Sequence, residues 1–157
     1  QRLPFSVGII NIRGGLNVGG IIRSASLFGA RRVVIFGRKV FDKRSTVGAH
    51  NYIKIKHYKE LSSLKINQVM AEHDMTPVFI EQGGTPLPEY QWAESKLWRH
   101  PCLIFGNENS GIPDYLLEEM KSFDRISIPQ RGVLRSFNVA STASIVMYDL
   151  SMKMGWV

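Results

Sequence analysis

The sequence predicts an α/β fold in which helices cover both faces of a mainly parallel β-sheet. Short apolar runs of the kind found in buried strands alternate along the chain with longer segments whose apolar residues recur at helical spacing. Such alternation is typical of strand–helix–strand units, and parallel strands joined in this way bury both faces of their sheet. With 157 residues, of which 44% are hydrophobic, the chain has the size of one compact domain.

The first half of the chain opens with a strand–helix–strand unit. The predicted elements are a strand at residues 5–10, a helix at 18–28, strands at 32–36 and 52–57, a helix at 61–73 and a strand at 77–80. Lysines occupy the outward face of the strand at 52–57. The segment 38–50 is basic and irregular, with room for one short helical turn.

The second half continues the alternation. Its predicted elements are a turn-rich segment at 83–89, a segment at 90–98 of unassigned type, a strand at 102–105, a helix at 114–120, a strand at 125–128 and a helix at 138–154. Polar, glycine-rich loops at 11–20, 106–111 and 129–138 follow predicted strands. Ligands bind beyond the carboxyl ends of parallel strands, so these loops either converge on one site or are ordinary turns.

Charge is distributed unevenly along the chain, whose net charge is +7. Residues 1–65 hold 13 Lys and Arg against 2 Asp and Glu, whereas residues 66–157 hold 7 against 11. The resulting balance of +11 against −4 favours a polyanionic partner such as RNA, because neutralised phosphates release condensed counterions. An ordinary solvated basic surface is the alternative.

Several classes of protein find no support in the sequence. No run approaches the roughly 18 apolar residues of a membrane span, and no signal peptide is visible, so a cytoplasmic protein without membrane contact is expected. The single cysteine, Cys102, lies in an apolar run and is expected to be buried and inert. Neither the cysteine count nor the histidine spacing suggests a metal site, and dinucleotide and P-loop motifs are lacking.

Three segments at predicted strand ends resemble the three motifs of the SpoU/TrmH branch of the SPOUT methyltransferases. They are residues 17–29 (NVGGIIRSASLFG), 104–112 (IFGNENSGI) and 128–139 (IPQRGVLRSFNV). The resemblance covers roughly residues 6–154, which matches a bare catalytic domain. Since the first residue is Gln, residues 1–157 are expected to be a single domain that can belong to a longer protein.

The resemblance implies a trefoil knot at the C-terminal side of the sheet, an exception to the usual absence of knots. It also implies that S-adenosylmethionine lies in the knotted crevice, held mainly by backbone groups at Gly106, Ile128 and Phe137. Phe137 stands where leucine is commoner in the family. At Gly106 the missing Cβ permits close approach of a ligand, although a simple turn after the strand would also explain this glycine.

The same resemblance implies that Arg23 is catalytic, in a reaction that methylates a ribose 2′-hydroxyl. This hydroxyl is a poor nucleophile until its proton is removed or the developing oxyanion is stabilised. A guanidinium stays protonated in proteins, so we expect Arg23 to clamp the phosphate beside the ribose and to stabilise the alkoxide. An arginine that merely faces solvent is the alternative.

Four more polar residues carry over to the site by resemblance: Asn17, Glu108, Ser136 and Asn138. Asn17 and Asn138 can equally be helix caps, because asparagine is favoured at that position. Glu108 is placed to pair with Arg23, or it is a solvated loop acid. Tryptophans at 92, 98 and 156 are expected to pack rather than to stack on RNA bases.

The resemblance implies a homodimer that methylates tRNA or rRNA, and the third motif is similar to the branch that modifies a guanosine ribose in the tRNA D-loop. Two other functions stay open at this point. One is a methyltransferase-like RNA-binding module without turnover, and the other is an α/β enzyme that uses its glycine-rich loops to bind a small anionic substrate.

Overall fold

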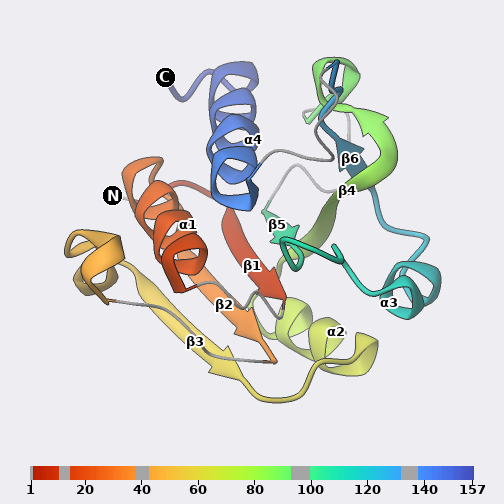
Figure 1. The fold of residues 1–157 in the computed structure, drawn as a ribbon, viewed down its shortest axis with the longest axis horizontal. Coiled ribbons are helices and arrows are strands. Elements are labelled where there is room, and N and C mark those ends of the chain that lie inside the picture. Colours follow the sequence, from red (N-terminus) through yellow and green to blue (C-terminus); the bar gives the residue numbers. More distant parts are fainter. Residues whose placement is uncertain (1, 11–14, 38–42, 93–99, 132–137) are drawn as a thin grey trace.

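The computed structural model describes residues 2–10, 15–37, 43–92, 100–131 and 138–157. Six parallel strands form one sheet with the order β3-β2-β1-β5-β4-β6 (Figure 1). The strands are β1 (Ser6–Ile10), β2 (Arg32–Phe36), β3 (Lys54–Tyr58), β4 (Thr76–Pro86), β5 (Pro101–Phe105) and β6 (Arg125–Ser127). Because all six run in the same direction, their carboxyl ends meet at one edge of the sheet.

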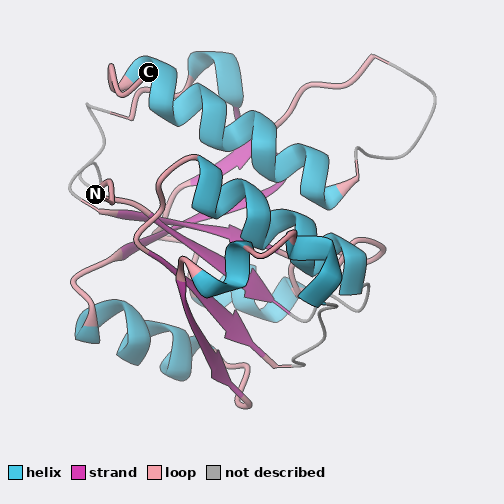
Figure 2. Cartoon of the chain, turned by 90° about the vertical axis from the view of Figure 1, so that its left-hand side faces the viewer, coloured by secondary structure: helices cyan, strands magenta, loops and turns pink. Residues whose placement is uncertain are grey.

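Helices cover both faces of this sheet (Figure 2). They are α1 (Gly15–Leu27), α2 (Ser63–Glu72), α3 (Asp114–Glu119) and α4 (Val139–Lys153), with 3₁₀ turns η1 (Lys43–Thr46), η2 (Ala49–Asn51) and η3 (Leu87–Glu89). The buried side chains of α1 and α4 form one apolar cluster with one face of the strands. Those of α2 and α3 form a second cluster on the other face. The predicted fold class is therefore confirmed.

Helices α1 and α4 pack closely because small residues line their contact. A Cβ built on Gly20 would lie 3.1 Å from the Cβ of Ala140, so a larger residue at position 20 would push the helices apart. Farther along, the hydroxyls of Ser24 and Ser144 share a hydrogen bond of 2.8 Å. This contact fixes the start of α4 relative to α1, and both helices begin at the carboxyl edge of the sheet.

Most predicted elements lie where the sequence indicated. The strand at 32–36 has the predicted bounds, and the other confirmed elements except β4 differ from prediction by up to three residues at an end. Lys54 and Lys56 are exposed on β3, and Cys102 is buried, which raises the pKa of its thiol to about 12. In the described part of the chain, no helix is long and apolar enough to span a membrane.

The prediction of a turn at residues 83–89 was wrong for its first half, because β4 continues to Pro86. Two glycines allow this continuation. Gly83 adopts a positive φ of 85°, and the register of β4 against β6 shifts between Ile80 and Thr85. A Cβ on Gly84 would lie 2.4 Å from the carbonyl oxygen of Arg125, so only glycine lets the strands approach here. The bend keeps β6 paired with β4 beyond Ile80.

Two predicted features fall wholly or partly outside the described residues. The unassigned segment 90–98 is described only to Trp92, which is buried and donates a hydrogen bond of 2.9 Å to Asp149. Trp156 stacks on Phe5 at 5.9 Å between ring centroids, so these two tryptophans pack as expected. Trp98 is not among the described residues. The connection between β6 and α4 includes residues 132–137, so the path that would form the knot stays a prediction.

Replacing Gly84 with alanine tests the close approach of β4 and β6. We expect Gly84→Ala to lower the free energy of unfolding by about 3 kcal/mol, the upper range for overpacking, because a backbone carbonyl cannot yield as a side chain can. Chemical denaturation followed by circular dichroism measures this change. Lys54→Ala, an exposed substitution on β3, serves as control with an expected change within about 0.5 kcal/mol. Equal stability of the two variants would contradict the account.

Candidate functional site

A cavity of about 880 Å³ opens at the carboxyl edge of the sheet, where β4, β5 and β6 lie side by side. Its walls come from the bend of β4, the loop after β5, the end of β6 and the first turn of α4. The lining residues are Ile80, Glu81, Gln82, Phe105, Gly106, Asn107, Glu108, Asn109, Ser110, Gly111, Ser127, Ile128, Gln130, Val139 and Thr142. This volume is within the usual range of small-molecule sites.

The loop after β5 is closed by hydrogen bonds of its own. The amide of Asn107 donates to the carbonyl of Gly111 at 3.1 Å, and the amide of Gly111 donates back at 2.8 Å. The side-chain oxygen of Asn107 accepts from the amides of Asn109 at 2.8 Å and Ser110 at 3.1 Å. The sequence Gly-Asn-Glu-Asn-Ser-Gly therefore builds a compact loop that holds Glu108 at the cavity, with its Oε2 atom buried.

Gly106 is required by the backbone of this loop. A Cβ at this position would lie 2.5 Å from the carbonyl carbon of Gly111 and from the amide nitrogen of Ile112. No side chain fits between these backbones, so Gly106 presents only main-chain atoms to the cavity. The missing Cβ at Gly106 thus permits close approach of the returning loop, as the alternative of a turn after the strand requires, and close approach of a ligand stays a prediction.

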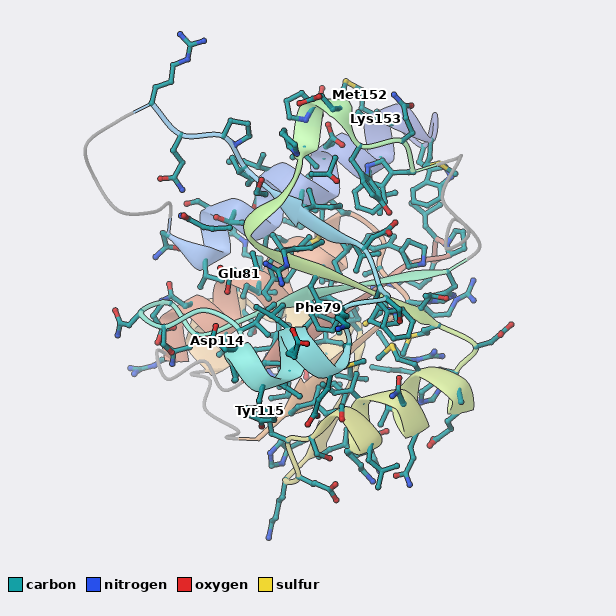
Figure 3. All side chains as sticks on the ribbon, turned by 90° about the vertical axis from the view of Figure 1, so that its right-hand side faces the viewer. Phe79, Glu81, Asp114, Tyr115, Met152 and Lys153 are labelled. Carbon is teal, nitrogen blue, oxygen red and sulfur yellow. The ribbon has the colours of Figure 1, made fainter. Side chains whose placement is uncertain are left out.

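Glu81 is a residue of the site that sequence reasoning missed. It lies at the bend of β4 and projects toward the loop after β5 (Figure 3). Its carboxylate accepts a hydrogen bond of 2.7 Å from the amide of Ile112 and one of 2.9 Å from the amide of Gln82. Gly111, with φ of 72°, passes so close to this carboxylate that a Cβ would collide with it. A carboxylate directly after the apolar run at 77–80 was the available signal, because strand ends carry ligand-binding groups.

Asn17 and Asn138 lie together at the beginning of the two packed helices. The side-chain amide of Asn138 donates a hydrogen bond of 2.9 Å to the side-chain oxygen of Asn17. The side-chain oxygen of Asn138 caps α4 by accepting from the amides of Ala140 and Ser141. Val139 and Thr142 in this first turn line the cavity, so the cap also positions one wall of the site.

The structure brings some predicted site residues together and leaves others apart. Gly106, Glu108 and Ile128 line the same cavity. Arg23 lies exposed on α1, does not line the cavity within this chain, and forms no ion pair with Glu108 or any other described residue. The sequence-based suggestion that Arg23 pairs with Glu108 therefore finds no support in the chain by itself. Ser136 and Phe137 lie outside the described residues.

The cavity fits S-adenosylmethionine in size and in chemistry. Two carboxylates, Glu81 and Glu108, line it, and they match a ligand that carries a sulfonium and an ammonium. Apolar walls from Ile80, Phe105 and Val139 offer a surface for a flat base. The backbone of the loop at Gly106 adds hydrogen-bonding groups that need no particular side chain.

A second pair of polar side chains lies at the opposite edge of the sheet. Ser6 Oγ and His100 Nε2 are 2.8 Å apart and both residues are buried. Burial lowers the pKa of His100 to about 4, and the nearby Arg31 adds to this effect. This pair is closed to a substrate and ties β1 to the segment before β5. Among the described residues, no group of three or more His, Cys, Asp or Glu is arranged to hold a metal ion.

Comparison with known proteins places the chain among RNA methyltransferases. Residues 4–148 match the model of the SpoU rRNA Methylase family. Relatives include a Yersinia pestis tRNA (cytidine(34)-2′-O)-methyltransferase, 25% identical over 89% of this chain and 88% of the relative. A Bacillus subtilis 23S rRNA (guanosine(2553)-2′-O)-methyltransferase is 32% identical over 85% of this chain and 52% of the relative. A mouse tRNA (guanosine(18)-2′-O)-methyltransferase is 25% identical over 85% of this chain, which spans only 8% of that relative.

Solved structures share the fold. The A. aeolicus TrmH/SpoU tRNA modifying enzyme superposes with a TM-score of 0.81 at 18% identity, over 99% of this chain and 78% of that enzyme. The SpoU methyltransferase AviRb from Streptomyces viridochromogenes, in complex with the cofactor AdoMet, gives a TM-score of 0.78 at 21% identity. This superposition covers 98% of this chain and 59% of AviRb. At 18% and 21% identity, these two likenesses establish the shared fold alone.

The predicted family is confirmed by these findings, and the AdoMet complex of AviRb agrees with the predicted methyl donor, S-adenosylmethionine. An α/β enzyme for an unrelated small anionic substrate, the third function left open by the sequence, is not supported. The family match extends over all three motif segments, and two of them line the cavity at Gly106 and Ile128. This chain belongs to the SpoU rRNA Methylase family.

Proposed function

We propose that this chain methylates a ribose 2′-hydroxyl of tRNA or rRNA at the cavity between the loop after β5 and the end of β6. The observation that carries the proposal is the convergence of Gly106, Glu108 and Ile128, from two separate motifs, on one cavity of suitable size. S-adenosylmethionine, when bound, supplies a methyl group activated by its sulfonium. The chain itself must hold this donor, orient the ribose and stabilise the oxygen that loses its proton.

The donor is held by the walls already described. Main-chain groups at Gly106 and Ile128 bind without side-chain identity, and Glu81 keeps the loop after β5 in the shape that exposes them. Glu81 and Glu108 favour a cationic ligand in this partly enclosed space, where charge interactions are stronger than in water. Ser136 and Phe137 complete the third motif by resemblance, and their roles in substrate and donor binding are part of this proposal.

Arg23 stabilises the developing alkoxide and clamps the neighbouring phosphate in this proposal. Because Arg23 is exposed and does not line the cavity of its own chain, we infer that it serves the cavity of a second copy. Ser24, the residue after Arg23, contacts Ser144 on α4, so Arg23 comes from the part of α1 that packs against α4. A dimer that pairs the α1–α4 surfaces would bring each Arg23 toward the partner's site.

The exposed face of α4 suits such pairing. Ile145, Tyr148 and Met152 recur at helical spacing and are 38%, 53% and 50% exposed, which leaves an apolar stripe along the helix (Figure 3 labels Met152). The same helix lines the cavity with Val139 and Thr142 at its first turn. One helix thus carries both a wall of the site and the surface proposed to pair in a homodimer.

For the RNA substrate, we propose a guanosine ribose of the tRNA D-loop, as the third motif indicates. The relatives are named for a guanosine of tRNA, a cytidine of tRNA and a guanosine of rRNA. The choice of the nucleotide to be methylated therefore depends on features beyond the donor cavity. Mass mapping of tRNA treated with the protein identifies the nucleotide directly. Methylation confined to another position would refute this choice and leave the 2′-O-methyltransferase activity in place.

Glu81→Gln tests the role of Glu81 in shaping the donor site. The side-chain amide of glutamine would turn its own N–H toward one of the two backbone N–H groups that now donate to Glu81. A hydrogen bond to a charged group is worth about 1.5–3 kcal/mol, so its loss is substantial. We expect S-adenosylmethionine to bind at least about tenfold more weakly, as measured by titration calorimetry. Glu89→Gln, an exposed substitution with the same charge change, is the control. Unchanged affinity in Glu81→Gln would contradict this role.

Arg23→Ala tests the proposed catalytic role. We expect methyl transfer to bulk tRNA to fall by about 10² to 10³, the usual loss when an oxyanion-stabilising donor is removed, with donor affinity unchanged. Radiolabelled methyl incorporation measures this effect. Substantial activity in Arg23→Lys would show that charge is sufficient, whereas inactivity would show that the planar guanidinium is needed.

Mixing two impaired variants, at a donor concentration too low to saturate Glu81→Gln, tests whether Arg23 acts across the dimer. If Arg23 serves the partner's cavity, a mixed dimer of Arg23→Ala with Glu81→Gln holds one site with both residues intact and regains part of the activity. Mixtures that stay inactive after subunit exchange would contradict action in the partner.

Wild-type protein that binds donor and RNA but never transfers a methyl group would support the alternative, an RNA-binding module without turnover.

Tyr148→Glu tests the α4 stripe as the dimer surface. A carboxylate in the middle of an apolar contact must be desolvated, so we expect the variant to sediment as a monomer while its circular dichroism spectrum is unchanged. Leu64→Glu is the matched control, because Leu64 is 65% exposed on α2, on the other face of the sheet. A dimer that survives Tyr148→Glu, or one broken equally by both changes, would refute this assignment.

A further inference from the structure

A cluster of lysines surrounds one tyrosine at the end of β3, the edge strand of the sheet. The Nζ atom of Lys65 lies 5.1 Å from the centroid of the Tyr58 ring, and the Nζ atom of Lys56 lies 6.0 Å from it. Lys56 comes from β3 and Lys65 from α2, which lies beside the end of β3 (Figure 1). Two separate elements therefore direct cationic groups to the same aromatic ring.

The ring of Tyr58 is held in place by the apolar residues on which it packs. Tyr58 stacks on Phe36 at 5.6 Å between centroids and packs against the apolar cluster on the α2 side of the sheet. An aromatic face attracts a cation, and this attraction offsets part of the repulsion between the two ammonium groups. Burial raises the pKa of Tyr58, and Glu72 acts in the same direction. The phenol is neutral at physiological pH, so the ring adds no negative charge of its own.

Positive charge exceeds negative charge around this ring. Lys59 is exposed directly after Tyr58, and at the other end of β3 the exposed Lys54 pairs in register with Arg32. The acids in the vicinity include Glu72, the exposed Glu60, which accepts a hydrogen bond from Ser62, and Glu119, which accepts one from Ser63. The local excess of cations is the arrangement expected of a surface that meets a polyanion.

The position of the cluster relates it to the donor cavity. Tyr58 pairs with Phe36 in the parallel register, and Phe36 pairs with Ile10. Ile9 pairs with Phe105, so Ile10 stands level with Gly106. Tyr58 and Gly106 thus lie at the same level of the carboxyl edge, three strand spacings apart, which corresponds to about 14 Å at about 4.8 Å per spacing.

We propose that Lys56, Lys65 and Tyr58 form a phosphate-binding ridge for the RNA strand beside the methylated nucleotide. The inference rests on the proposed function, because it places the ridge along the edge that holds the donor cavity. The two ammonium groups bind backbone phosphates and carry no sequence information. The tyrosine keeps them together and at a fixed height on the sheet edge.

The test measures binding of unfractionated tRNA by fluorescence anisotropy at several salt concentrations. The double variant Lys56→Gln/Lys65→Gln removes two charges, so we expect the slope of log affinity against log salt to become shallower by about 1.4 to 1.8. Lys121→Glu, an exposed change just after α3 that alters net charge equally, should leave the slope nearly unchanged. Tyr58→Phe keeps the ring and should bind as wild type.

The outcomes separate the ridge from the proposed function. A double variant with the wild-type slope, or a slope lowered equally by Lys121→Glu, overturns the ridge even if wild-type protein methylates tRNA. Wild-type protein that does not bind tRNA also overturns it. Conversely, loss of slope in the double variant supports the ridge even if no methyl transfer is found. Calorimetry with S-adenosylmethionine on the double variant should give wild-type affinity, which verifies that the cavity is intact.

Discussion

The carboxylate of Glu81 ties together the two strand ends that frame the site. Its two oxygens accept hydrogen bonds from the amides of Ile112 and Gln82, so the bend of β4 and the loop after β5 share one anchor. The approach is so close that Gly111 and Gly106 have no room for a Cβ. The shape of the cavity follows from this contact, since the loop that carries Glu108 is fixed at both ends.

The parallel sheet gives this contact its functional setting. All six strands end at one edge, so loops that are distant in sequence meet there. Helix α4, held by its packing on α1, adds a further wall, because the cap at Asn138 sets the first turn of α4 against the cavity. That shared edge is the basis of all three proposals: donor binding by backbone groups, a guanidinium from a second copy and a basic ridge at β3.

Local sequence patterns were sufficient to predict much of the fold and part of the site. The apolar run at 32–36 predicted β2 with its observed bounds, and the three motifs predicted Gly106 and Ile128 at one site. The pattern failed at residues 83–86, where glycine and proline usually mark a turn. Here the two glycines instead let β4 bend and stay paired with β6, which only tertiary contact decides. Glu81 was missed for the same reason, since its importance lies in a contact with residues about thirty positions away.

The most direct measurement of the central claim is the structure of this protein with S-adenosylhomocysteine, the product left after methyl transfer. The account predicts that this molecule lies in the cavity between Gly106 and Ile128, with its cationic amino group near Glu81 or Glu108. A complex in which the ligand occupies another part of the surface, or in which the carboxylates face away from it, would contradict the assignment of this cavity as the donor site.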